Sequence, residues 1–90
     1  MTIAFDCDGC LIDKEGVAIN ENVALLKVLS KRYKVFVWSG NNWQYVWTVV
    51  INLGIQDHIH GVLNKYNTFT PDIVFDDQEI NLGKLNICTK

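Results

Sequence analysis

The fold is decided by the stretch Thr2-Ile3-Ala4-Phe5-Asp6-Cys7-Asp8-Gly9. Its residues from Thr2 to Asp6 form a short, mainly apolar run without alternation, which predicts a strand buried on both faces of a sheet. Two carboxylates stand at the end of this strand. Gly9 and Gly16 then mark residues 9–19 as a loop or small flap.

The rest of the chain alternates between helical and strand patterns. The first helix is predicted to have Asn20 as its cap and to end near Arg32. The second follows a capping turn at residues 40–42 and ends at Leu53, before Gly54, with the apolar stripe Val46, Val49, Val50 and Leu53. Further strands are predicted at residues 35–38, 61–63, 73–75 and 85–88. Strands that alternate with helices favour parallel pairing.

Polar side chains stand where four of the predicted strands end. They are Asp6 and Asp8 after the first strand, Ser39 after the second, Asn64-Lys65 after the third and Asp76-Asp77 after the fourth. The carboxyl ends of parallel strands share one edge of the sheet, where open α/β sheets bind ligands. We therefore expect these groups to meet in one cleft.

Four carboxylates in one cleft repel each other, so either some are protonated or a divalent cation lies among them. Oxygen ligands with open positions suit Mg²⁺, and a bound Mg²⁺ attracts phosphate. Ser39 and Lys65 add donors for phosphate oxygens. Aspartate is a known nucleophile toward phosphorus, and a carboxyl two residues later can act as acid and then base. The residues thus predict phosphoryl transfer through an aspartyl-phosphate.

The same residues resemble the four motifs of the haloacid dehalogenase (HAD) superfamily. The first motif, DxDGx followed by an apolar residue, is similar to Phe5-Asp6-Cys7-Asp8-Gly9-Cys10-Leu11. The second is similar to Val35-Phe36-Val37-Trp38-Ser39-Gly40, and Lys65 is the candidate for the third. The fourth is similar to Ile73-Val74-Phe75-Asp76-Asp77. The motifs stand in the family's order and span residues 3–77.

The resemblance implies a magnesium-dependent phosphomonoester hydrolase with a role for each motif residue. Asp6 would be the nucleophile, and Asp8 would protonate the leaving group and then activate water. Ser39 and Gly40 would bind the transferring phosphoryl group together with Asp6 and Lys65, and Lys65 would also neutralise its charge. An Asp at the second acidic position is typical of phosphatases and phosphotransferases in this family, and dehalogenases lack it.

The resemblance also implies a metal site. Mg²⁺ would be held by Asp6, by the backbone carbonyl of Asp8 and by Asp76, directly or through water, with Asp77 in support. One residue departs from the family's pattern, since Cys10 stands where the family usually has Thr.

For the fold, the resemblance implies one catalytic domain over residues 1–90, a three-layer Rossmann-like α/β fold and a parallel sheet in the order 5-4-1-2-3. The segments between the motifs are too short for a cap domain. Capless members often act on large substrates or cover the site with a neighbouring subunit, so a homo-oligomer is one expected arrangement. Trp43 and Trp47, at i and i+4, are expected in the core; if exposed, they would mark an interface.

Composition narrows the class further. Ninety residues, 49% hydrophobic and 20% charged, are typical of one globular domain. A net charge of -2 argues against non-specific nucleic-acid binding. No apolar run is long enough to span a membrane, and the first residues lack signal-peptide features. We expect a cytoplasmic protein whose partner is a phosphorylated small molecule or an exposed phosphate on a macromolecule.

Other interpretations stay open. A non-catalytic binding or assembly module could retain the metal site. A phosphate-accepting receiver domain would carry its modified Asp at the end of the third strand, where this chain has Asn64-Lys65. Taken singly, Ser39 and Asp77 could be ordinary turn residues, and Lys65 could be a surface lysine.

Two further residue pairs are expected to be structural. Cys7 and Cys10 form a CxxC, but no second Cys/His pair supports zinc, so core positions are expected. His58 and His60 precede the third strand and are expected at the surface.

Overall fold

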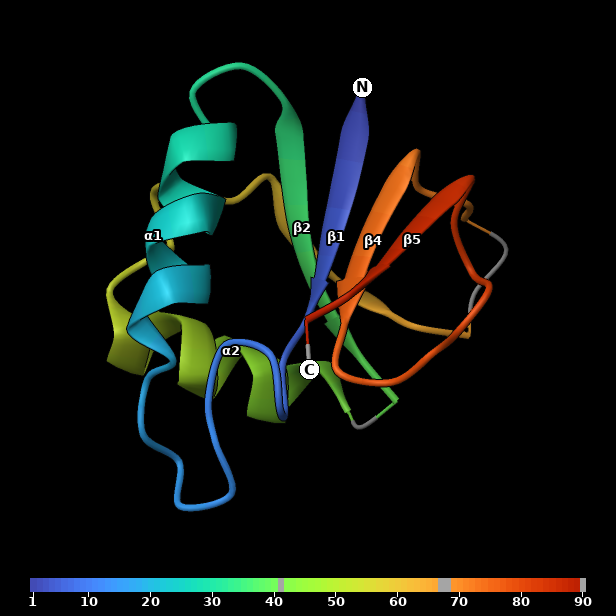
Figure 1. The fold of residues 1–90 in the computed structure, drawn as a ribbon. Coiled ribbons are helices and arrows are strands. Elements are labelled where there is room, and N and C mark those ends of the chain that lie inside the picture. The colour runs from blue at the N-terminus through green and yellow to red at the C-terminus, as the bar shows by residue number, and fades with distance from the viewer. Residues whose placement is uncertain (41, 67–68, 90) are drawn as a thin grey trace.

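The computed structural model describes residues 1–40, 42–66 and 69–89. These residues form five strands and two helices, in the order β1 (Thr2–Asp6), α1 (Asn20–Leu29), β2 (Lys34–Ser39), α2 (Trp43–Leu53), β3 (Gly61–Asn64), β4 (Ile73–Asp76) and β5 (Leu85–Cys88). The strands are all parallel and form one sheet in the order β3-β2-β1-β4-β5 (Figure 1). Read from its other edge, this is the predicted order 5-4-1-2-3, which is confirmed.

The register of the sheet aligns the ends of its strands. In the central strand β1, Asp6 lies opposite Trp38 of β2, and Phe5 lies opposite Phe75 of β4. Ser39, the next residue of β2, lies opposite Asn64 of β3. The strands run in one direction, so their last residues reach the same edge of the sheet, toward the bottom of Figure 1. This is the edge at which the polar side chains were expected to meet.

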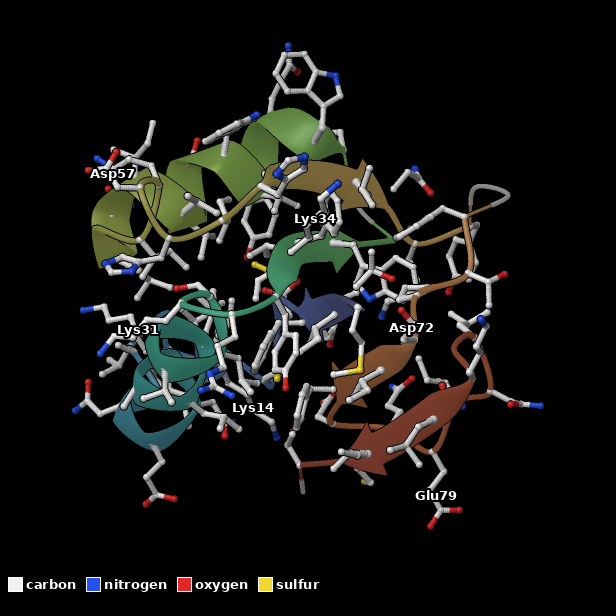
Figure 2. The ribbon with its side chains drawn as sticks, turned by 90° about the horizontal axis from the view of Figure 1, so that it is seen from above. Lys14, Lys31, Lys34, Asp57, Asp72 and Glu79 are labelled. Atoms are coloured by element: carbon white, nitrogen blue, oxygen red, sulfur yellow. The ribbon has the colours of Figure 1, made fainter. Side chains whose placement is uncertain are left out.

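Both helices cover the same face of the sheet. Buried side chains of α1 and α2 form one cluster with alternate strand residues, among them Ile3, Phe5, Val35, Val37 and Phe75. On the opposite face, Ala4, Trp38 and Val74 pack against Leu63, Ile80 and Leu82. Figure 2, which views the molecule from above, shows the helices on one side of the sheet and irregular segments on the other.

The prediction of three layers is therefore wrong for the described residues. Residues 65–72 connect β3 to β4, and residues 77–84 connect β4 to β5. A helical crossover between parallel strands usually needs about a dozen residues or more. These connections are too short for one, and their described parts are irregular. What stands is an α/β fold with an all-parallel sheet, compatible with a Rossmann-like fold, and one helical layer.

The helix ends predicted from the sequence agree with the structure for α2 but not for α1. In α2, the side chain of Asn42 accepts a hydrogen bond from the backbone N–H of Tyr45 at 2.8 Å, and Gly54 ends the helix with a φ of 69°. This confirms the predicted cap and stop, although Asn41 lies outside the described residues. In α1, Asn20 is the first helical residue rather than the cap, since Ile19 holds the cap position without a side-chain hydrogen bond. The helix also ends earlier than predicted, at Leu29.

The apolar stripe of α2 meets the core as predicted. Val46, Val49 and Val50 are buried, and Leu53 is half-buried against the same cluster. Trp47 also packs there, but Trp43 is 59% exposed. The expectation of core packing is wrong for Trp43, which stands at the first position of α2, ahead of the first buried residue.

Neither described helix is long and apolar enough to cross a membrane.

Candidate active site

A cavity of about 770 Å³ lies at the edge where the strands end. Among the predicted site residues, its lining includes Asp6, Asp8, Ser39, Gly40, Lys65 and Asp77. Asp76 is buried and reaches the same group through a hydrogen bond from Lys65. The structure therefore brings together the side chains that the sequence places at the ends of four strands. The flap, the first turn of α2 and Gln78 complete the lining.

Lys65 joins the two buried carboxylates. Its Nζ lies 2.8 Å from Oδ1 of Asp6 and 2.9 Å from Oδ2 of Asp76. The backbone holds the lysine in place, because its N–H donates to the carbonyl oxygen of Ser39 at 2.9 Å and so extends the pairing of β2 with β3. Only 11% of the lysine side chain is exposed. Lys65 is thus not an ordinary surface lysine.

Burial is the largest single influence on the pKa values of Asp6 and Lys65. It raises the pKa of Asp6 from 3.8 to about 6, although Lys65 acts to lower it, and the neighbouring Asp76 and Asp77 add to the rise. Burial acts against the charged form of Lys65 as well, but hydrogen bonds to Asp6 and Asp76 raise the pKa of the lysine. The carboxyl group of Asp6 is therefore harder to ionise than an exposed one, and a second cation beside it would favour its charged form.

Three carboxylates offer a place for such a cation. Asp6, Asp76 and Asp77 can each present one ligand oxygen, and these oxygens lie within 4.8 Å of one another. The backbone N–H of Gln78 donates to Oδ1 of Asp76 at 3.0 Å and helps to orient it. Hard carboxylate oxygens suit Mg²⁺. The residues present therefore fit the predicted ion. The side chain of Asp8 is not in this group.

Tyr45 lines this cavity and contacts a predicted site residue, although the sequence analysis did not single it out. Its hydroxyl donates to Oδ1 of Asp8 at 2.6 Å. This hydrogen bond is the main reason that the pKa of Tyr45 rises to about 12. One signal was available, because Tyr45 is the third residue of the helix that follows the end of β2 at Ser39. The first turn of such a helix lies beside the edge where the ligand is expected.

Some of the other lysines lie near the cavity, and others lie near the opposite edge of the sheet, where the strands begin. Lys14, on the flap, also lines the cavity. Lys31 and Lys34 lie in the turn before β2 and at its start, near the edge where the strands begin (Figure 2). Lys84 forms an ion pair with Asp72 at 3.3 Å, just ahead of β5. Lys65 and Lys14 are therefore the lysines of the described residues that line the cavity.

The two cysteines lie in the core as predicted, and of the two histidines only His60 is exposed. Cys7 and Cys10 are buried, and burial raises the pKa of each thiol to about 12, so both stay protonated and serve the core. His60 is exposed and its ring contacts Phe36 edge to face. His58 is half-buried, with Nδ1 3.5 Å from the hydroxyl of Ser30. Neither histidine lines the cavity.

Gly9 lies close to Asp77, one of the three carboxylates that could hold a metal ion. Its φ is +81°, and a Cβ at this position would lie 2.2 Å from Oδ2 of Asp77. We predict that Gly9→Ala lowers the free energy of unfolding by about 1–2 kcal/mol through backbone strain. The new methyl group should also displace Asp77 and weaken Mg²⁺ binding. Urea unfolding and titration calorimetry with Mg²⁺ measure the two effects.

Gly16 provides the matched control. Its φ is +78°, but nothing lies within 4 Å of a Cβ built there. Gly16→Ala should therefore show the backbone strain and leave Mg²⁺ affinity unchanged. Equal Mg²⁺ affinity in both variants would mean that the position of Asp77 does not matter for the metal.

Comparison with protein-family models, curated proteins and solved structures found no match to this chain.

Proposed function

We propose that this protein is a magnesium-dependent phosphomonoester hydrolase of the HAD type, with Asp6 as its nucleophile. One observation carries the proposal. Two buried carboxylates, Asp6 and Asp76, share the ammonium group of Lys65 at 2.8 and 2.9 Å in a cavity that also contains Asp8. Clusters of buried, charged groups with perturbed pKa values are more common at functional sites than elsewhere.

The reaction has two steps. A carboxylate oxygen of Asp6 attacks phosphorus, and the bond between phosphorus and the ester oxygen breaks. Asp8 gives its proton to that oxygen, so the product leaves as an alcohol. A water molecule then gives a proton to Asp8 and attacks the phosphorus of the aspartyl-phosphate. This releases inorganic phosphate and restores both aspartates.

The remaining residues stabilise charge and position. Lys65 balances negative charge on Asp6 and on the phosphoryl group, and it is preorganised by its backbone bond to Ser39. Ser39 and Gly40, at the end of β2, would contact phosphoryl oxygens. Mg²⁺, held by Asp6, Asp76 and Asp77, would supply further positive charge for the phosphoryl oxygens.

Metal dependence is the first test. A panel of phosphomonoesters, assayed with purified protein, should be hydrolysed with Mg²⁺ and not in excess chelator, and Mg²⁺ should restore the activity. Ca²⁺ should bind but not support turnover, since it prefers more ligands at longer distances. By calorimetry, Asp76→Asn should lose most of the Mg²⁺ affinity.

Asp57 gives a control for this test. It lies on the turn after α2, at the far end of that helix from the cavity (Figure 2), so Asp57→Asn should keep both Mg²⁺ affinity and activity. Full activity in excess chelator would contradict the metal site. Mg²⁺ binding without hydrolysis of any ester would instead favour the binding module.

The role of Asp8 predicts a dependence on the leaving group. Asp8→Asn should reduce turnover of an alkyl phosphate by about 10²-fold or more, because a general acid contributes on that order. The loss on 4-nitrophenyl phosphate should be much smaller, since nitrophenolate leaves without protonation. Steady-state kinetics with both esters gives the ratio. Equal losses on the two esters would argue against an acid role.

A further inference from the structure

The hydroxyl of Tyr45 contacts the carboxyl group to which the proposed function gives the proton transfers. The oxygen–oxygen distance of 2.6 Å is short for a hydrogen bond and is typical of one made to a carboxylate. Both residues line the cavity, and Asp8 is an exposed residue on the loop that follows β1. An exposed carboxyl on a loop samples several rotamers unless a neighbour holds it.

Tyr45 is well placed to hold that carboxyl. It lies in the first turn of α2, and its own backbone N–H is bonded to the capping side chain of Asn42 at 2.8 Å. The next residue, Val46, is fully buried in the core. The tyrosine therefore extends from a rigid helix end rather than from the flap. Groups on helices and strands are held more accurately than groups on loops.

The group that contacts Asp8 is a phenol hydroxyl, which donates the hydrogen bond. A hydroxyl can orient the carboxyl without adding a charge that would compete with the phosphoryl group.

We propose that Tyr45 is a positioning residue that holds the carboxyl of Asp8 toward the leaving-group oxygen; the inference rests on the proposed function. The benefit of this position is largest when the leaving group needs a proton. It is small when the leaving group departs as a stable anion. The tyrosine acts through Asp8, so its effect should disappear when Asp8 can no longer transfer a proton.

The test is Tyr45→Phe, measured with an alkyl phosphate and with 4-nitrophenyl phosphate in the same preparation. We expect kcat on the alkyl ester to fall by about 10-fold or more, because small misplacements of a reacting group are costly. The change on the nitrophenyl ester should be less than about 3-fold, since its leaving group needs little protonation. The ratio of the two activities does not depend on the fraction of folded enzyme, so a loss of stability would not mask the result.

Tyr33→Phe is the matched control, because it removes a hydroxyl from a half-buried tyrosine outside the cavity lining. Its activity ratio should equal that of the wild type. In the Asp8→Asn background, Tyr45→Phe should cause no further change in the ratio.

Two other outcomes are distinct. Equal losses on both esters in Tyr45→Phe would overturn the role of Tyr45 and leave the proposed function standing. The same conclusion would follow if Asp8→Asn altered the ratio of the two activities and Tyr45→Phe did not. Absence of turnover by the wild-type protein on every ester would overturn the proposed function, and the inference with it.

Discussion

Asp6→Asn should abolish hydrolysis while the protein stays folded. An amide oxygen is a poor nucleophile toward phosphorus, so turnover should fall by at least about 10³-fold, as expected when the nucleophile of a covalent mechanism is removed. The substitution keeps the shape of the side chain and removes a buried charge whose ionisation is already disfavoured by burial. Without metal, the variant should therefore unfold at the same temperature as the wild type or higher.

The control for Asp6→Asn is Glu15→Gln, which removes a carboxylate from the flap side of the same cavity. It should retain activity within a few-fold, since its side chain has no role in the two steps. Thermal unfolding by circular dichroism checks the fold of both variants. Activity near the wild-type level in Asp6→Asn would refute the mechanism.

Lys65→Ala should cause the second large loss. It removes the ammonium group that contacts both Asp6 and Asp76, so turnover should fall by about 10²-fold or more, comparable to the loss of one preorganised charge-stabilising donor. Lys14 is the matched control, since it also lines the cavity but comes from the exposed flap. Lys14→Ala should cost much less. If Lys14→Ala were the severe change and Lys65→Ala the mild one, the flap would supply the cation.

The same variant should change how stability depends on pH. Lys65 lowers the pKa of Asp6, so its removal raises that pKa above the value of about 6 in the wild type. A folded-state pKa above the unfolded value means that the folded protein binds the proton more tightly, so stability falls as pH rises through the folded pKa. Metal-free Lys65→Ala should thus gain more stability than the wild type when the pH is lowered from 7 to 5. Urea unfolding at the two pH values measures this.

The convergence of the site could be predicted because it depends only on strand direction. Each apolar strand runs into a polar residue, and in a parallel sheet those ends share an edge. The backbone position of Lys65 follows from the register, which places Ser39 opposite Asn64 and so fixes the next residue. The order of the strands agrees with the one that the resemblance implies, but strand direction alone does not determine it.

Features that depend on side-chain direction or chain length were harder to predict. The contact between Tyr45 and Asp8 joins residues 37 positions apart, and no local pattern shows where a tyrosine on a helix will point. The described residues form no helical layer on the second face of the sheet. The shortness of residues 65–72 and 77–84 could have indicated this, but the resemblance to a three-layer family favoured the opposite conclusion. At α1, Asn20 is a residue type that often caps helices, but it is the first residue inside the helix and Ile19 holds the cap position.

Trapping the covalent intermediate tests the central claim most directly. Wild-type protein with Mg²⁺ and a ³²P-labelled phosphomonoester is quenched in acid within one turnover, and a parallel sample is reduced with borohydride, which converts an aspartyl-phosphate to homoserine. We predict acid-stable label on the protein and homoserine at position 6 in the peptide mass spectrum, with neither in Asp6→Asn. Rapid hydrolysis of the ester with no labelled protein, or with the label on another residue, would contradict the account.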